Sequence, residues 1–336
     1  MILLFHILAL WHGLKRKNAR GLLTRSYDAA STKRRVQDWK TVNSSANTEV
    51  LQALVTVRNR ARDLRRNNAY AAKIVQSLAS NVIGTGILAS SNDSNFLALY
   101  NTWADSTDAD ANGNTNYYGI QKLVFESLVE SGEVLIVRHY DKTKINPLRL
   151  KVLEADYLDH TKHDLAKNLV QGVQFDGADN VTGYWIFSNH PGEVSSQSTL
   201  VNAGDVIHLY RADRPGQVRG ISWLSPVIIQ LKKLSDFEDA LLEKQIISNL
   251  FTGFIYDANE TSSSATTDTA AFEPGSMVTL GPGKTIEWSN PPQPSAPESY
   301  LGHSLRSIAA GVGIPYEVLT GNLSEVNFSS ARISWR

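Results

Sequence analysis

The sequence predicts an α+β fold, in which helices and strands occupy separate stretches of the chain. Apolar residues recur at helical spacing over residues 46–131 and again after Pro226. Between these stretches, residues 132–212 contain short β-branched and aromatic runs separated by Asp, Gly and Asn, which is typical of antiparallel strands. Apolar residues make up 42% and charged residues 20% of the 336 residues, a composition typical of ordered protein.

The first helical stretch predicts four helices. Ser44, Ser45 and Thr48 are candidate caps for a helix in which Leu51, Leu54, Val57, Ala61 and Leu64 follow one face. Four arginines lie on the flanks of that helix: Arg58, Arg62, Arg65 and Arg66. A second helix is expected over residues 69–82, because Gly84 can adopt the left-handed conformation that ends a helix. Residues 96–103 and 117–130 are the other helical candidates.

The β-rich module consists of five runs that predict strands. These are GEVLIVRHY, LRLKVLEADYL, VQGVQFD, VTGYWIFS and GDVIHLYR, all between residues 132 and 211.

A long helix is predicted to follow this module. Residues 227–251 contain neither Gly nor Pro, and Pro226 suits the first turn of a helix. At 1.5 Å per residue such a helix is roughly 38 Å long. Lys232, Lys233 and Asp236 lie off its apolar stripe, so a helix charged on several sides suits a rod in an assembly.

The last part of the chain alternates strand-like and helical pieces. Residues 254–256, 277–280 and 285–288 are strand-like, and PPQPSAP is an extended linker. A further helix is expected over residues 298–311, because the residue before Pro315 disfavours helical geometry. Residues 321–330 form a polar loop, and SSARISWR, residues 329–336, is expected to begin a new helix.

The N-terminal 45 residues form an arm of two parts. An apolar run ends by Leu14, too short for a membrane-spanning helix, and positive charge follows it, unlike a signal peptide. We expect this run to pack on a partner or a neighbouring subunit, with peripheral membrane contact as the alternative. Basic residues dominate 15–40, which predicts a solvated arm or one that contacts acidic partners or DNA.

Charge and cysteine content exclude several classes of function. Lys+Arg and Asp+Glu are both 33, which argues against tight binding of nucleic acid through many phosphate contacts. The absence of cysteine excludes disulfides, thiolate zinc sites and a cysteine nucleophile.

The stretch LGPGKTIEW, residues 280–288, imitates the end of a phosphate-binding loop. The first glycine of that motif is replaced by Val278, and Pro282 removes a backbone N–H that a phosphate would need. The residues after Lys284 predict a strand, so no helix N-terminus follows to hold an anion. A Gly-Pro-Gly hairpin turn explains these residues.

Two other stretches imitate metal sites. DADANGNTNYYG, residues 108–119, begins like a calcium loop, but Gly119 stands where a bidentate glutamate is needed. His160 and His163 lie between Asp159 and Asp164, a pattern that is usually polar surface. Because no set of residues assembles a catalytic centre, we expect no enzyme, no cofactor and no metal.

Six phrases of the sequence resemble one known family. They are YDAAS, RARDLRRNNAYAAKIVQSLASNVIGTGI, ESGEVLIV, VIHLYRADRPGQVRGISWLSPVI, EPGSMVTLGPGKTIEWSNP and LRSIAAGVGIPYEVLTGNLSEVNFSSAR. Their order and spacing over nearly the whole chain resemble the lambda-type portal proteins of tailed bacteriophages.

The resemblance implies an elongated subunit with an α/β wing, a stem of long helices and a small β-containing clip. Residues 1–45 are then the basic arm, 46–220 the wing, 221–252 the first stem helix and 253–290 the clip. A linker and the second stem helix take residues 291–320, followed at 321–336 by the tunnel loop and the start of a long helix.

The resemblance also implies function and partners. Portal subunits form a ring, usually of twelve copies, at one capsid vertex, through which double-stranded DNA is packaged and ejected. The ring docks the terminase large subunit, which is the ATPase, and contacts the major capsid and head-completion proteins. The subunit is then found in the virion, and in the host cytoplasm during assembly, with no membrane contact.

Three sets of site residues follow from the same resemblance. The channel-facing tunnel loop takes Asn322, Leu323, Ser324, Glu325, Val326 and Asn327, which cannot grip phosphates and so let DNA slide. Pro282, Lys284 and Glu287 lie in the clip that docks the motor, and Lys232, Lys233 and Asp236 lie on the stem.

Portal proteins of this type continue with a long helix and a crown behind the tunnel loop, whereas this sequence ends one turn into that helix. We therefore expect the crown to be missing. The alternatives are a prophage remnant that does not assemble, or a nucleotide-binding enzyme acting through GPGKT.

Overall fold

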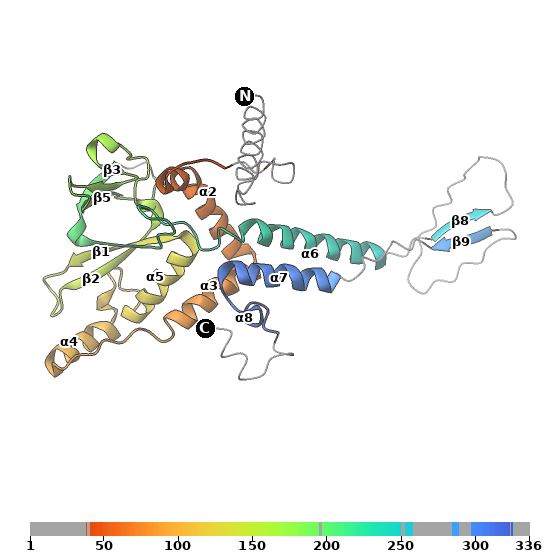
Figure 1. The fold of residues 1–336 in the computed structure, drawn as a ribbon. Coiled ribbons are helices and arrows are strands. Elements are labelled where there is room, and N and C mark those ends of the chain that lie inside the picture. The colour runs from red at the N-terminus through yellow and green to blue at the C-terminus, as the bar shows by residue number, and fades with distance from the viewer. Residues whose placement is uncertain are drawn as a thin grey trace, which may run out of the picture. The chain divides into compact units, whose positions relative to one another are not determined.

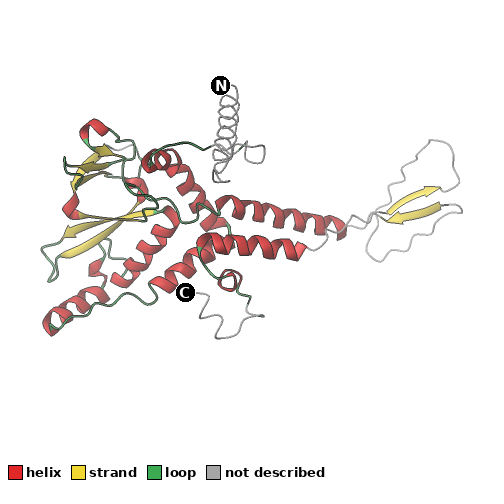
Figure 2. Cartoon of the chain, viewed as in Figure 1, coloured by secondary structure: helices red, strands yellow, loops and turns green. Residues whose placement is uncertain are grey.

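The computed structural model describes residues 41–194, 197–249, 253–257, 284–288 and 297–322, together with Asp38 and Ser324. By its internal contacts the chain divides into two units, Met1–Ser45 and Ala46–Arg336, and the following paragraphs concern the second. Helices and strands occupy separate stretches of this unit (Figure 1, Figure 2), so the α+β class is confirmed. The expectations for the N-terminal apolar run and most of the basic arm lie outside the described residues.

The four helices expected before the sheets are present. They are α2 (Ala46–Asn67), α3 (Ala69–Val82), α4 (Ser94–Asp105) and α5 (Tyr117–Ser131). Asn68 separates the first two, and its side chain accepts a hydrogen bond from Ala71 N at 2.9 Å, as a helix N-cap does. The amide of the same side chain donates to Ser235 Oγ at 2.8 Å, so this cap also contacts the later helix α6. None of the helices in the described part of the chain is long and apolar enough to cross a membrane.

Two antiparallel sheets form the β-rich module. The first has the order β2-β1-β7, and the second the order β3-β4-β5-β6. Their bounds are β1 Glu133–Tyr140, β2 Leu148–Glu154, β3 Leu169–Val170, β4 Val173–Phe175, β5 Val181–Phe187, β6 Ser198–Asn202 and β7 Val206–Tyr210. Short 3₁₀ helices lie between strands at η4 (Ala155–Tyr157), η5 (Leu165–Lys167) and η6 (Ala203–Asp205), whereas η3 (Thr107–Ala109) lies between α4 and α5.

The strands depart from the expectation in two places. The run VQGVQFD is a hairpin rather than one strand, because Gln171 and Gly172 have φ values of 50° and 88° and turn the chain between β3 and β4. Strand β6 was not predicted; it pairs with β5 at the edge of the second sheet.

Three clusters of buried apolar residues hold the unit together. A helical core joins α2, α3 and α5 to the later helices and includes Leu64, Ile74, Leu231 and Ile308. A second core packs α4 and α5 on one face of the first sheet, through Val134 and Ile136 of β1. A third lies between the two sheets, and Leu135 of β1 contributes to it. Adjacent residues of β1 thus serve different cores, as the alternation of a strand requires.

The long helix predicted after Pro226 is confirmed as α6, Ile228–Asn249. It begins two residues later than predicted, because residues 224–227 form turns in which Val227 N donates to Leu224 O at 2.9 Å. The second predicted helix is α7, Pro297–Val312. The rings of Phe237 and Tyr300 are 4.7 Å apart, and a Cβ on Gly311 would lie 2.6 Å from a methyl carbon of Val227, so the helices run antiparallel and in close contact.

The remaining described elements are a two-stranded ribbon and a short helix. Strands β8 (Gly253–Asp257) and β9 (Lys284–Trp288) pair antiparallel, with Ile255 opposite Ile286. These match two of the three strand-like pieces, whereas residues 277–280 lie outside the described part. Helix α8 (Tyr316–Thr320) was not predicted; it ends at Gly321, whose φ is 71°.

Candidate functional site

A row of arginines on α2 faces a row of glutamates on α5. Arg58, Arg62 and Arg65 are spaced so that they share one face of the helix. Arg65 contacts Glu130 at 2.7 Å and Glu126 at 2.5 Å, and Arg62 Nε lies 3.5 Å from Glu130. The two helices are therefore joined by ion pairs beside their shared apolar core.

The same arginines also contact the end of β2 and the 3₁₀ helix η4 that follows it. An Nη atom of Arg62 lies 2.6 Å from Asp156 and 3.0 Å from Glu154, and an Nη atom of Arg58 lies 3.0 Å from Asp156. Arg58 is only 2% exposed. The sequence places these arginines on the flanks of the helix without indicating burial, and the structure shows that Arg58 is buried against the sheet module.

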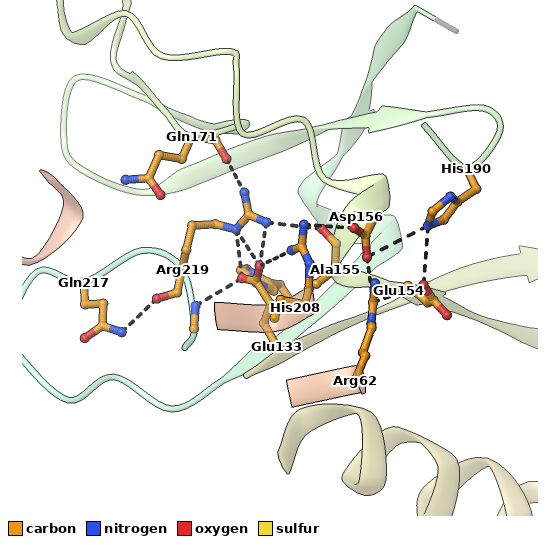
Figure 3. Close-up of polar contacts among 12 residues, drawn as sticks. Arg62, Glu133, Glu154, Ala155, Asp156, Gln171, His190, His208, Gln217 and Arg219 are labelled. Atoms are coloured by element: carbon orange, nitrogen blue, oxygen red, sulfur yellow. Dashed lines mark hydrogen bonds and ion pairs between the residues drawn. The ribbon is translucent and has the colours of Figure 1, made fainter. Parts of the chain in front are cut away.

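The buried end of the row is the pair Glu133–Arg219 (Figure 3). Both side chains are essentially inaccessible to solvent, at 1% and 0% exposure. Arg219 Nε donates to both carboxylate oxygens at 3.0 and 2.8 Å, and one Nη donates at 2.5 Å. His208 Nε2 and the backbone N–H of Gly220 also contact this carboxylate, at 3.0 and 3.1 Å. A buried charge is tolerated only when it is paired and hydrogen-bonded in this way.

Arg219 reaches beyond its carboxylate to two backbone carbonyls. One Nη donates to Gln171 O at 2.8 Å and the other to Ala155 O at 3.3 Å. The Gln171 amide in turn donates to Asn47 O at 2.6 Å, at the beginning of α2. One guanidinium thus contacts the first residue of β1, the 3₁₀ helix η4 and the β3–β4 turn.

The connection from β7 to α6 lies directly against the beginning of β1. A Cβ on Gly220 would overlap the carbonyl oxygen of Gly132, so both positions need glycine. Trp223 N donates to Val129 O at 3.0 Å, and Val218 N donates to the Asn47 side chain at 2.9 Å. Residues 218–223 of this connection are therefore hydrogen-bonded to α2, α5 and the beginning of β1.

The charges of this network reinforce each other. Burial alone would raise the pKa of Glu133, but the Arg219 guanidinium and the His208 hydrogen bond hold it well below the ordinary carboxyl range. Asp156 likewise has a lowered pKa, because Arg58 and Arg62 outweigh its burial. Burial lowers the pKa of Arg58, while Asp156 and Glu133 counteract that shift. The Glu133 and Asp156 carboxylates are therefore charged near neutral pH.

The network resembles a metal site at one point only. Glu154, Asp156 and His190 bring their ligand atoms within 4.8 Å of one another. Arg62 already places its guanidinium between the two carboxylates, at the distances given above, so a cation of the protein occupies that position. These ion pairs therefore stabilise the contact of α2 with β2 and η4.

In the two stretches that imitate metal sites, the carboxylates accept hydrogen bonds from the protein itself. The Asp110 carboxylate accepts from the backbone N–H groups of Asn112 and Asn114 at 3.0 and 2.9 Å. Asp159 accepts from Thr161 and from Ser198, both hydroxyl contacts being 2.6 Å. The Asp110 carboxylate thus faces its own turn, whereas Asp159 joins its turn to the first residue of β6.

The stem residues expected from the sequence lie on α6. Lys232, Lys233 and Asp236 are all exposed, and Lys232 forms an ion pair with Asp236 one turn away. They lie on the solvent-facing side of the helix whose opposite side enters the helical core.

The clip residues are described only in part. Lys284 and Glu287 belong to strand β9, where they are opposite Asp257 and Phe254, and Pro282 lies outside the described residues. Because Lys284 begins a strand and not a helix, the geometry of a phosphate-binding loop is missing here.

Of the tunnel-loop residues, Asn322 and Ser324 are described and exposed. The Asn322 side-chain oxygen accepts from Ser324 N at 3.1 Å and from Ser324 Oγ at 2.7 Å, which forms a tight polar turn. Leu323, Glu325, Val326 and Asn327 lie outside the described residues.

The ionic network is therefore distinct from all three predicted sets, and sequence reasoning missed it. Its signal was nevertheless in the sequence: Arg58, Arg62 and Arg65 have the same spacing as Glu126, Glu130 and Glu133. Matching rows of opposite charge, one on α2 and the other on α5 and the first residue of β1, indicate that these segments pair.

Comparisons with known proteins agree with this architecture. The family model described as phage portal protein, lambda family, matches residues 32–335. The portal protein of Escherichia phage N15 is 23% identical over 359 residues, which cover 89% of this chain and 67% of that protein. Portal protein B of Escherichia phage lambda is 21% identical over 354 residues, covering 89% of this chain and 66% of that protein. The chain thus spans about two thirds of the length of these relatives.

Solved structures share the fold. A chain in the neck of the native gene transfer agent particle, computed with C12 symmetry, matches with a TM-score of 0.54 and 14% identity, covering 82% of this chain and 74% of that chain. A chain in the neck of the empty particle, computed with C6 symmetry, matches with a TM-score of 0.56 and 14% identity, covering 82% and 75%. Because the family model extends over most of its length, the chain belongs to the lambda family of phage portal proteins.

Proposed function

We propose that this chain is the subunit of a portal ring at one vertex of a phage capsid, through which double-stranded DNA is packaged and ejected. The single observation that supports this most is the family match over residues 32–335. Two relatives of similar sequence are themselves portal proteins, and the fold recurs in particle necks computed with C12 and C6 symmetry. A ring of twelve copies of this chain is the arrangement we favour.

In this proposal α6 and α7 belong to the stem, within residues 221–252 and 291–320. The physical support is that α6 has apolar residues both on its buried side and on its exposed sides. Leu231 and Leu234 are buried in the helical core, whereas Ile229 and Leu242 on the other sides of α6 are 55% and 61% exposed. Such exposed apolar residues on a helix that is fixed at one end suit contact with a neighbouring copy.

The ribbon of β8 and β9 is the described part of the proposed clip, residues 253–290, which would dock the terminase large subunit. Portal proteins are structural, and the proposal gives this chain no catalytic step, because ATP hydrolysis is left to that motor. Lys284 and Glu287 on β9, with Pro282 before it, are the proposed docking residues. The wing, residues 46–220, is the proposed contact surface for the major capsid and head-completion proteins of the virion.

The proposed tunnel loop, Asn322 to Asn327, would face the DNA. Its sequence has one acidic and no basic residue, so it cannot form strong phosphate contacts. A channel that holds DNA loosely lets it slide under the force of the motor. Assembly of the ring would take place in the host cytoplasm.

Ring formation is the direct test. The purified chain, and a chimera that adds the remaining segment of the phage N15 portal protein, are imaged by negative-stain electron microscopy and weighed by native mass spectrometry. We expect closed rings with a central hole, at least from the chimera. Monomers alone, from both proteins at tens of micromolar, would contradict the proposal.

Docking and sliding are tested by charge reversal. The double substitution K284E/E287K should weaken capture of the large terminase subunit of the same phage, whereas K142E in the exposed β1–β2 turn should not. Asn322→Lys with Asn327→Lys should slow packaging in a particle-producing system by adding phosphate contacts to the channel. The matched control is Asn112→Lys on the wing, and equal packaging by both variants would contradict the channel assignment.

A further inference from the structure

The side chain of Arg219 contacts several segments of the chain, and these segments pack in different apolar cores. Glu133 is the first residue of β1, in the sheet that α5 covers. Gln171 is in the turn of β3 and β4, which belong to the four-stranded sheet. Arg219 itself lies in the connection that leads to α6 and the helical core. Its guanidinium is thus the point at which the two sheets and the stem-side connection meet (Figure 3).

The turn that Arg219 contacts is under conformational constraint. Gln171 has φ of 50°, a left-handed conformation that non-glycine residues adopt at a cost, and its side chain is fully buried. Its backbone carbonyl accepts from Arg219, and its side-chain amide donates to Asn47 at 2.6 Å. Such a conformation persists when the surroundings hold it on several sides, and Arg219 is one of those contacts.

From these contacts we propose that Arg219 is a positioning residue, which fixes the four-stranded sheet and the connection into α6 on the beginning of β1. The planar guanidinium is suited to this because its donors diverge in fixed directions toward a carboxylate and two carbonyls. A lysine at this position keeps the charge but cannot reach all three partners. The proposal concerns one copy of the chain and does not depend on ring formation.

The chain offers a clean test, because it has no cysteine and every introduced one can be labelled selectively. Spin labels are placed at Q76C on α3 and A178C in the β4–β5 turn, both exposed. Labelled copies are diluted with unlabelled chain, so that only distances within one copy contribute. The distance distribution is measured by double electron–electron resonance.

We expect a narrow distribution in the otherwise unchanged chain and a broad one in Arg219→Lys. The matched control is Arg60→Lys, an exposed arginine on α2, which should leave the distribution narrow. The double variant E133Q/R219Q removes both charges together, so that neither is left buried alone. It should be more stable to urea than Arg219→Gln and still give a broad distribution, which separates positioning from stability.

Hydrogen exchange supplies a second measurement that does not require a variant to fold. In the unchanged chain, the backbone amides of Gly172 and Gly220 should exchange only when the whole unit unfolds, and therefore slowly. In any folded Arg219 variant their exchange should be roughly tenfold faster or more. Narrow distributions in folded Arg219→Lys and E133Q/R219Q would overturn the proposal. Fast local exchange of both amides in the unchanged chain would overturn it as well.

Discussion

Replacing Gly132 by alanine tests whether the contact between β1 and the connection into α6 is as close as the structure shows. Gly132 ends α5 in the left-handed conformation, with φ of 88°, and its N–H donates to Leu128 O at 2.9 Å. An added Cβ would overlap the carbonyl carbon of Ile221 and lie 2.5 Å from Ser222 N. These are backbone atoms, so no side-chain rotation can relieve the overlap.

The magnitude of the effect has two parts. A left-handed conformation at a non-glycine residue costs ~1–2 kcal/mol. Overpacking in a close-packed region costs a further ~1–3 kcal/mol, so Gly132→Ala should lower the free energy of unfolding by ~2–5 kcal/mol. Gly313 provides the matched control: its φ is 74°, and nothing lies within 4 Å of an added Cβ. Gly313→Ala should therefore cost only the first ~1–2 kcal/mol.

Urea unfolding, followed by far-ultraviolet circular dichroism and by the fluorescence of the seven tryptophans, measures both variants. The two probes also show whether the unit unfolds in one transition. A loss for Gly132→Ala no greater than that for Gly313→Ala would refute the argument. That result would mean that the two backbones separate easily at this point.

Three further predictions are tested by unfolding in urea or by heating. Burial alone would raise the pKa of Glu133, but Arg219 and His208 hold it below the ordinary value, so the unfolded chain takes up the proton first. The urea midpoint should therefore fall as the pH drops below the ordinary carboxyl pKa of about 4, with a shallower fall in E133Q/R219Q; equal acid dependence would contradict this. Ile308→Ala removes a fully buried side chain and should lower the free energy of unfolding by ~2–5 kcal/mol. Ile229 is 55% exposed, so Ile229→Ala should lower it by less than ~1 kcal/mol in a monomeric sample. Asp179 has φ of 62° in an exposed turn, so Asp179→Gly should raise the thermal midpoint and Asp179→Val should lower it, and the reverse order would exclude strain at this turn.

Local sequence signals predicted the helices well. The bounds of α3 agree with the expectation because Asn68 caps its beginning and Gly84, with φ of 58°, follows its end. Strand β6 was missed because Ser198–Asn202 is short and mixes polar with apolar residues at a sheet edge. Pairing with β5, rather than intrinsic preference, decides its conformation.

The ionic network was missed because its partners are distant in the chain. The residue type alone predicts that Arg58 on α2 is exposed to solvent, because arginine is rarely buried unless it is paired. Its pairing with Asp156 depends on a loop almost a hundred residues later, which no local pattern specifies. The predicted domain limits, and the roles of the stem, clip and tunnel-loop residues, stay predictions.

The antiparallel contact of α6 and α7 has a consequence for how such a protein can vary. Because Phe237 and Tyr300 touch and Gly311 meets Val227, the chain leaves the helical core and returns to it at neighbouring points. The chain between Phe237 and Tyr300 thus begins and ends at neighbouring points of this helix pair, as a cassette does. Such a cassette can be lengthened, shortened or grafted from another phage without repacking the base on which it stands.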